Sequence, residues 1–324
     1  MARRDVRTQA LDRARANDAK SPEPKADLKA RFDDLYRAFD HVDSATDPIH
    51  IVRRYRARDD REIVGFCAAS LAFGRVASVL NTVETLTRAL GSSPGAYVRR
   101  FDPKAPHPEL RAMVHRWIRG VDIVALLWVL RQMLDRSGSI EAFFLEGLEP
   151  QAVDLGDALD SFSRRALALD LTSVYGRRKP PRMGVCYFFP RPSAGSGCKR
   201  LNLFLRWMVR RDEVDLGAWR SVPRSKLIVP LDTHVIRLGK CLGLTRYTSP
   251  GWRMAAQITA SLRAIDPDDP VRFDFSICHV GMMNACGFGR RQGDTQCPLK
   301  GICRPHRRAA TAPGPRSRRS LPRS

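Results

Sequence analysis

The sequence has no apolar stretch long enough to cross a lipid bilayer. The longest run extends from Ile123 to Leu130, whereas a membrane-spanning helix needs about 20 apolar residues. No secretory leader follows Met1, because the first residues are charged and polar rather than apolar. These absences argue against a membrane protein. They predict a protein of the cytoplasm, where disulfide bonds are uncommon.

Alternating patterns that mark β-strands are also scarce. Val185 to Phe189 is the best candidate strand, and it is short. Helical spacing of apolar residues is frequent, and the sequence therefore predicts an all-α fold. The expected helices lie near residues 28–42, 75–90, 121–134, 154–169, 199–210, 233–243 and 251–265, with a last one from about 271.

Acidic residues are outnumbered by basic ones. Lys and Arg total 56 and Asp and Glu total 34, which gives a formal net charge of +22. Such an excess predicts a polyanionic partner, either nucleic acid or an anionic membrane surface. We expect residues 1–25 to be a disordered basic arm and residues 307–324 a disordered basic tail. Residues 26–306 then form one helical domain.

Two segments carry residues suited to chemistry. In the first, residues 194–202 read A-G-S-G-C-K-R-L-N, so Gly195 and Gly197 bound a turn that opens a helix, with Lys199 in its first turn. Such a turn and the free N–H groups of a helix start suit a phosphate. In the second, Asp232 precedes the helix 233–243 at the position expected of an N-cap. Alone, such a lysine is more often a phosphate contact, and such an aspartate only a cap.

Together, the two segments resemble the helix-hairpin-helix DNA glycosylase superfamily, which includes endonuclease III and the archaeal 8-oxoguanine glycosylases. Residues 231–244 begin L-D-T-H-V-I-R and end in L-G-L, similar to the V-D-T-H-V-x-R and R-L-G-L motifs of that superfamily. Residues 195–202 resemble its P-G-V-G-R-K-T-A-N hairpin. The resemblance covers about residues 30–306. The chain as a whole is also similar to a bacterial family of unknown function with the phrases C-K-R-L-N-x-F-L-R-W-M-V-R and P-L-D-T-H.

The resemblance implies a two-lobed glycosylase fold with a C-terminal cysteine-cluster loop, and base-excision repair of double-stranded DNA that carries a damaged base. It implies that Lys199 is the nucleophile that attacks a sugar and forms a Schiff base, with possible cleavage of the abasic strand, and that Asp232 is the catalytic carboxylate. Gly195, Gly197 and Arg200 would contact DNA. The two catalytic positions are farther apart in sequence than in endonuclease III (232 − 199 = 33), a separation that the archaeal branch tolerates.

A glycosylase must also fill the gap that the extruded nucleotide leaves. Residues 62–75 resemble the helix and turn that lead to the minor-groove wedge of the superfamily, which makes Phe73 and Arg75 the wedge candidates. Trp207 and Trp219 could stack on an extruded base. Tryptophans in such apolar surroundings are more often part of the core.

The cysteines of the last segment suggest a metal rather than disulfides. Cys286, Cys297 and Cys303 resemble three ligands of the endonuclease III iron–sulfur cluster (4Fe–4S), and Asp294 stands at the remaining position. Zinc held by the three cysteines and His306, or an empty site, are the alternatives. Cys278 lies too far along the last helix to join them, and we expect it to be a small buried hydrophobe.

Two other classes of function agree with the same composition. One is a helix-hairpin-helix protein that grips the DNA backbone without catalysis. The other is an RNA-binding or RNA-processing protein, since positive charge does not distinguish the two nucleic acids. The glycosylase is the leading hypothesis, because a backbone-gripping module has no need of Asp232 in its D-T-H motif. We expect it to act as a monomer associated with the nucleoid.

Overall fold

The computed structural model describes residues 25–41, 47–177, 183–282 and 297–303. Helices account for 59% of the structure and strands for 2%, which confirms the all-α prediction. The α-helices are α2 (Lys25–Phe39), α3 (Ile49–Val52), α4 (Arg58–Leu71), α5 (Val76–Leu90), α6 (Pro94–Arg99), α7 (Pro108–Ala112), α8 (Gly120–Ser137), α9 (Ile140–Leu145), α10 (Gly156–Leu167), α11 (Thr172–Tyr175), α12 (Lys199–Val209), α13 (Thr233–Leu242), α14 (Trp252–Arg263) and α15 (Asp274–Met282). The 3₁₀ helices are η2 (Gly184–Phe188), η3 (Pro192–Ala194) and η4 (Arg224–Lys226).

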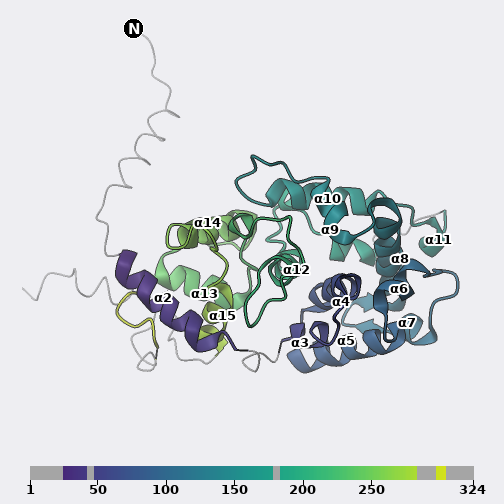
Figure 1. The fold of residues 1–324 in the computed structure, drawn as a ribbon, viewed down its shortest axis with the longest axis horizontal. Coiled ribbons are helices and arrows are strands. Elements are labelled where there is room, and N and C mark those ends of the chain that lie inside the picture. Colours follow the sequence, from purple (N-terminus) through teal and green to yellow (C-terminus); the bar gives the residue numbers. More distant parts are fainter. Residues whose placement is uncertain (1–24, 42–46, 178–182, 283–296, 304–324) are drawn as a thin grey trace, which may run out of the picture.

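The helices form two groups, with α12 between them (Figure 1). Helices α3 to α11 make up one group, and α2, α13, α14 and α15 make up the other. The first described helix therefore packs against the last one, and the rings of Phe32 and Phe273 lie 5.1 Å apart at that contact. None of the helices in the described ranges has the length and apolar character needed to span a membrane.

The two groups meet where α12 packs against α4. Ten of the 14 residues of α4 and nine of the 11 residues of α12 are buried, as expected for helices at the centre of a domain. Phe66 and Phe204 meet edge to face with their ring centroids 5.1 Å apart. A Cβ atom at Gly65 would lie 2.9 Å from the Met208 side chain, so glycine permits this close approach. The packing places the start of α12, and with it Lys199, near the end of α4.

The strand prediction was wrong. Residues 184–188 form the 3₁₀ helix η2, in which Cys186 N–H donates to Met183 O. Val185 and Phe188 are both buried, and a spacing of three matches the period of a 3₁₀ helix better than that of a strand. The strands of the described structure are instead β1 (Val114–His115) and β2 (Ile118–Arg119), which pair antiparallel as a short hairpin.

Candidate active site

A cavity of about 440 Å³ opens where the two groups of helices meet. Its walls come from the segment between α4 and α5, the start of α12, the start of α13 and one face of α15. The chemically functional side chains in its lining are Asp47, Lys199, Arg206, Asp232, Asp274, Cys278 and His279. Residues far apart in the sequence are thus brought together, and both predicted catalytic residues are among them.

Lys199 is the first residue of α12, as the turn preceding it predicts. Gly195 adopts φ +81°, a left-handed conformation that glycine takes without strain. Cys198 also has a positive φ, +46°, which is uncommon for a residue with a side chain and is most frequent at functional sites. Lys199 lines the cavity on one side and a smaller concavity of about 200 Å³, beside Gly197, on the other. Lys199 therefore lies between the concavity beside Gly197 and the cavity.

Asp232 is the N-cap of α13, also as predicted. Its Oδ1 accepts the backbone N–H groups of His234 at 2.9 Å and Val235 at 2.8 Å. Its Oδ2 accepts a hydrogen bond from the Cys278 thiol at 3.1 Å. Because both oxygen atoms are engaged, the carboxylate is held in one orientation at the cavity wall.

Cys278 corrects one expectation, because it is half-buried and belongs to the site instead of serving only as a core hydrophobe. Burial raises the pKa of its thiol, and the negative charges of Asp232 and Asp274 raise it further. The thiol therefore keeps its proton at neutral pH and donates it to Asp232. Sequence reasoning missed this role because it depends on how α15 crosses α13.

We expect Cys278→Ala to slow any reaction in which Asp232 takes part. The substitution removes the donor to Oδ2, and one such hydrogen bond corresponds to a rate effect of about 3- to 10-fold. Cys278→Ser retains a hydroxyl donor and should recover most of the rate. Single-turnover rates of the two variants and wild type would measure this, with Cys186→Ala, on an exposed residue outside the cavity lining, as the control. Equal rates for Cys278→Ala and wild type would contradict this role.

Asp274 and Arg206 form a buried ion pair in the cavity wall. Arg206 Nη1 donates to Asp274 Oδ2 at 2.7 Å, and Arg206 Nε donates to Asp215 at 3.2 Å. Burial raises the pKa of Asp274 to about 7, in spite of the arginine. Its Oδ1 has no hydrogen-bond partner among the described residues. Asp232 and Asp274 are thus two carboxyl groups in unlike environments, an arrangement suited to acid–base chemistry.

The spacing of Asp274 and Cys278 could have pointed to this wall. The two residues are four positions apart, which places them on one face of a helix. A helix face that packs in the core carries mainly apolar side chains, so an aspartate and a cysteine on one face indicate a different role for that face.

The predicted DNA-contacting residues have different environments. Phe73 lines the cavity, and Arg75 is exposed at the N-terminus of α5. The guanidinium of Arg200 instead turns into the protein, where it donates to Ser70 O at 3.1 Å and Tyr187 O at 2.5 Å. Burial lowers the pKa of Arg200 to about 10. Arg200 therefore supports the aromatic rings around Phe73, and it also lines the concavity beside Gly197.

Trp207 and Trp219 are core residues, as the more conservative interpretation predicts. Both are buried, and neither lines the cavity. The indole N–H of Trp219 donates to the buried Glu62 at 2.8 Å. Neither tryptophan is placed to stack on a base in this cavity.

The predicted metal ligands fall partly outside the described residues. Cys286 and Asp294 lie outside them, as does His306. Cys297 begins and Cys303 ends the described segment 297–303, in which Cys303 is buried. Across the described ranges, no group of three or more His, Cys, Asp or Glu side chains is arranged to hold a metal ion.

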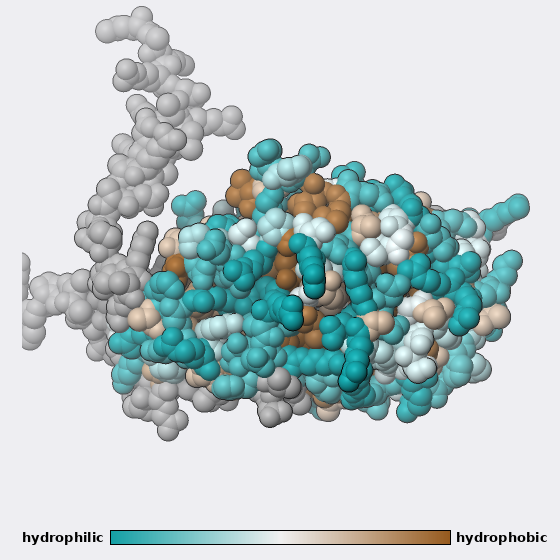
Figure 2. Space-filling view, viewed as in Figure 1, coloured by the Kyte–Doolittle hydropathy of each residue, from teal (hydrophilic) through white to brown (hydrophobic). Residues whose placement is uncertain are grey.

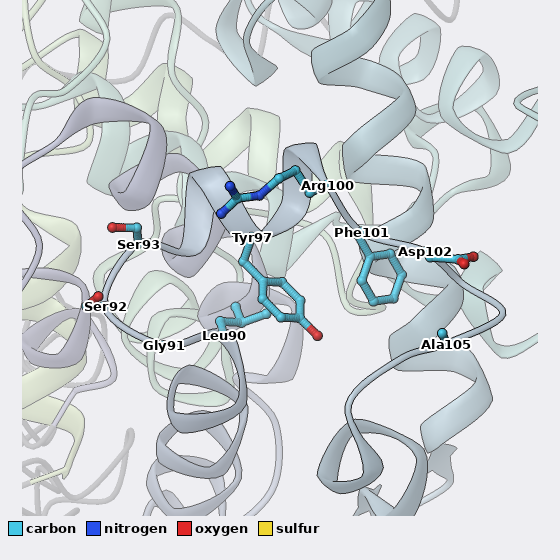
Figure 3. A pocket seen from close by; sticks show the side chains of 9 residues that line it. All are labelled: Leu90, Gly91, Ser92, Ser93, Tyr97, Arg100, Phe101, Asp102 and Ala105. Carbon is cyan, nitrogen blue, oxygen red and sulfur yellow. The ribbon is translucent and has the colours of Figure 1, made fainter.

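A second cavity, of about 550 Å³, lies around the loop between α5 and α6 (Figure 3). Its charged side chains are Arg100 and Asp102, which extend in different directions from the chain. It holds no cluster of convergent reactive groups comparable to the one around Lys199. The cavity of about 440 Å³ around Lys199 is therefore the better candidate for an active site.

Comparison with known proteins gives a family. Residues 47–283 match the family described as "Protein of unknown function (DUF2400)". Because this is well over half of the chain, the protein belongs to that family. No curated protein and no solved structure matches the chain. The matched range contains Lys199, Asp232, Asp274 and Cys278.

Proposed function

We propose that this protein is a DNA N-glycosylase that excises a damaged base and can nick the abasic strand. The observation that carries the proposal is that Lys199 and Asp232 line one cavity with Asp274 and Cys278. An amine nucleophile beside an oriented carboxylate is the pairing that such chemistry requires. A volume of about 440 Å³ is enough for one extruded base.

The proposed reaction begins when the neutral amine of Lys199 attacks C1′ of the sugar. The bond from C1′ to the base breaks, and the base leaves with the electron pair and takes up a proton. The carboxylate of Asp232 stabilises positive charge that develops on the sugar and accepts the amine proton. Ring opening then gives a Schiff base. Loss of a C2′ proton from it expels the 3′ phosphate oxygen and cuts the strand.

The surface beside Lys199 suits a DNA backbone. Helices α12 and α14 begin side by side, since Trp252 N–H donates to Gly195 O at 3.3 Å. Neither helix start has a side-chain cap, so backbone N–H groups remain there for an anion. Figure 2 shows one face of the molecule, which is mostly hydrophilic with a few apolar patches. The net charge of +22 favours a polyanion. We infer a monomer that works on nucleoid DNA in the cytoplasm.

Borohydride trapping tests this function directly. Purified protein would be incubated with a panel of lesion-bearing duplexes, and reduction should fix a covalent protein–DNA adduct on at least one of them. A non-catalytic helix-hairpin-helix protein would bind the same duplexes, yet no adduct would form on any lesion or on a natural abasic site. That second pattern would exclude the lysine chemistry.

We also propose that Cys286, Asp294, Cys297 and Cys303 hold an iron–sulfur cluster. Protein purified anaerobically should then be brown and contain about four iron atoms per chain. Cys303→Ser should lower the iron content, whereas Cys67→Ser, on the buried helix α4, should not. Colourless protein with one zinc per chain would replace the cluster with the zinc alternative. Folded, active protein without either metal would eliminate both.

A further inference from the structure

The β1–β2 hairpin presents a tryptophan beside the candidate cavity. The Trp117 side chain is 53% exposed, although tryptophan is usually largely buried. Arg116, just before it, has φ +55°, a strained conformation for a residue with a side chain. The hairpin is thus shaped so that Trp117 stands at its tip.

The Trp117 ring packs on a cluster of aromatic side chains and an arginine. Its ring lies parallel-stacked on Phe73, with centroids 4.9 Å apart and an interplanar angle of 29°. Tyr187 meets both rings edge to face at 5.1 Å. The Arg200 guanidinium lies 3.5 Å from the centre of the Tyr187 ring. This arrangement fixes the indole plane before any ligand arrives.

The hairpin is also fastened to the segment that lines the cavity. Burial lowers the pKa of His115, so its ring is neutral. Its Nε2–H donates to Phe73 O at 3.0 Å. The Arg116 side chain covers Gly74, where an added Cβ would meet it at 3.2 Å. Because Phe73 and Gly74 both line the cavity, the hairpin and Trp117 are packed directly against the cavity wall.

The surroundings of Trp117 are both apolar and positively charged. Other exposed apolar side chains lie nearby in the chain or the cavity: Val114 begins β1, Val121 follows β2 in α8, and Val76 lines the cavity. Residues 110–121 contain three arginines and no carboxylate. Aromatic faces interleaved with arginines are the usual surface for unstacked nucleobases, which need both stacking and phosphate neutralisation.

We propose that Trp117 forms a stacking platform for an unpaired nucleobase, the base opposite the extruded nucleotide. The inference rests on the proposed function only in taking DNA as the partner. The platform would be a DNA contact made by the β1–β2 hairpin, in addition to the wedge candidates Phe73 and Arg75. Phe73 serves as the base of the stack, while Trp117 offers a half-exposed ring with the Arg116 guanidinium 5.6 Å from its centre. The platform favours DNA in which a base has already lost its partner.

Binding to a duplex with a tetrahydrofuran abasic analogue tests the platform without any catalysis, because the analogue cannot form a Schiff base. The base opposite the analogue would be 2-aminopurine, and the comparison duplex would be fully paired. Trp117→Ala should weaken binding to the abasic duplex by about 10-fold or more, the effect of losing one base–aromatic stack. Binding to the paired duplex should change by less than about 2-fold. Wild type should quench 2-aminopurine fluorescence, and Trp117→Ala should not.

Two further variants separate stacking from folding. Trp117→Phe keeps an aromatic face and should retain most of the preference for the abasic duplex. Val153→Ala changes an exposed side chain outside the hairpin and should behave as wild type. Equal losses on both duplexes, or no loss on either, would overturn the platform. If borohydride trapping fails while the selective loss is seen, the platform stands and the lysine chemistry does not.

Discussion

Lys199→Gln is expected to abolish borohydride trapping and strand nicking while leaving DNA binding nearly intact. Glutamine keeps much of the length and the polarity of the side chain, but its amide nitrogen cannot attack C1′ or form a Schiff base. The first turn of α12 should persist, because glutamine is a good helix former. Binding survives because one side chain is a small part of an interface with many phosphate contacts.

Trapping gels and equilibrium binding on the same lesion duplex would measure both effects. Lys226→Gln is the matched control, because Lys226 donates to Pro150 O and lies outside the cavity lining. It should trap as wild type does. Adducts formed equally well by Lys199→Gln would mean that another amine is the nucleophile.

Asp232→Asn should lower the excision rate by about 100-fold or more, the usual cost of losing one charged catalytic group. The asparagine oxygen can still accept the N–H groups of His234 and Val235, so α13 keeps its cap. What is lost is the negative charge that supports the sugar cation and accepts the amine proton. The expected result is therefore a slow enzyme with a nearly unchanged melting temperature.

Single-turnover kinetics and thermal unfolding would be compared with Asp154→Asn. Asp154 also accepts a backbone N–H, from Gly156 at the start of α10, and lies outside the cavity lining. That control should change neither rate nor stability appreciably. A loss of stability that accounts for the whole loss of rate would reduce Asp232 to a structural cap.

The parts of the site that sequence reasoning predicted well are those set by short-range interactions. Glycine at 195 and apolar spacing after residue 199 place the start of α12 at Lys199. A capping side chain before an amphipathic segment places Asp232 at the start of α13. Both conclusions depend on hydrogen bonds and torsion angles within a few residues, and the structure agrees with both.

The errors arose where distant segments decide the outcome. Residues 184–188 took a 3₁₀ form because no neighbouring strand pairs with them and both apolar side chains reach the core. The hairpin at residues 114–119 has strands of only two residues, too short to leave a periodic signal. The packing of the Arg200 guanidinium on the rings of Phe73 and Tyr187 likewise depends on segments distant in the sequence, which the motif could not indicate.

Composition, periodicity and local capping are enough to predict the helical class, the helix starts that carry Lys199 and Asp232, and the excess of positive charge, because these properties act along the chain. Three features appear only in the folded protein: Cys278 donates to Asp232, Asp274 lines the same cavity, and Trp117 stacks on Phe73. Those contacts depend on how the helices and the hairpin pack in space. Burial, hydrogen bonding and ring stacking act there between residues that are dozens of positions apart in the sequence.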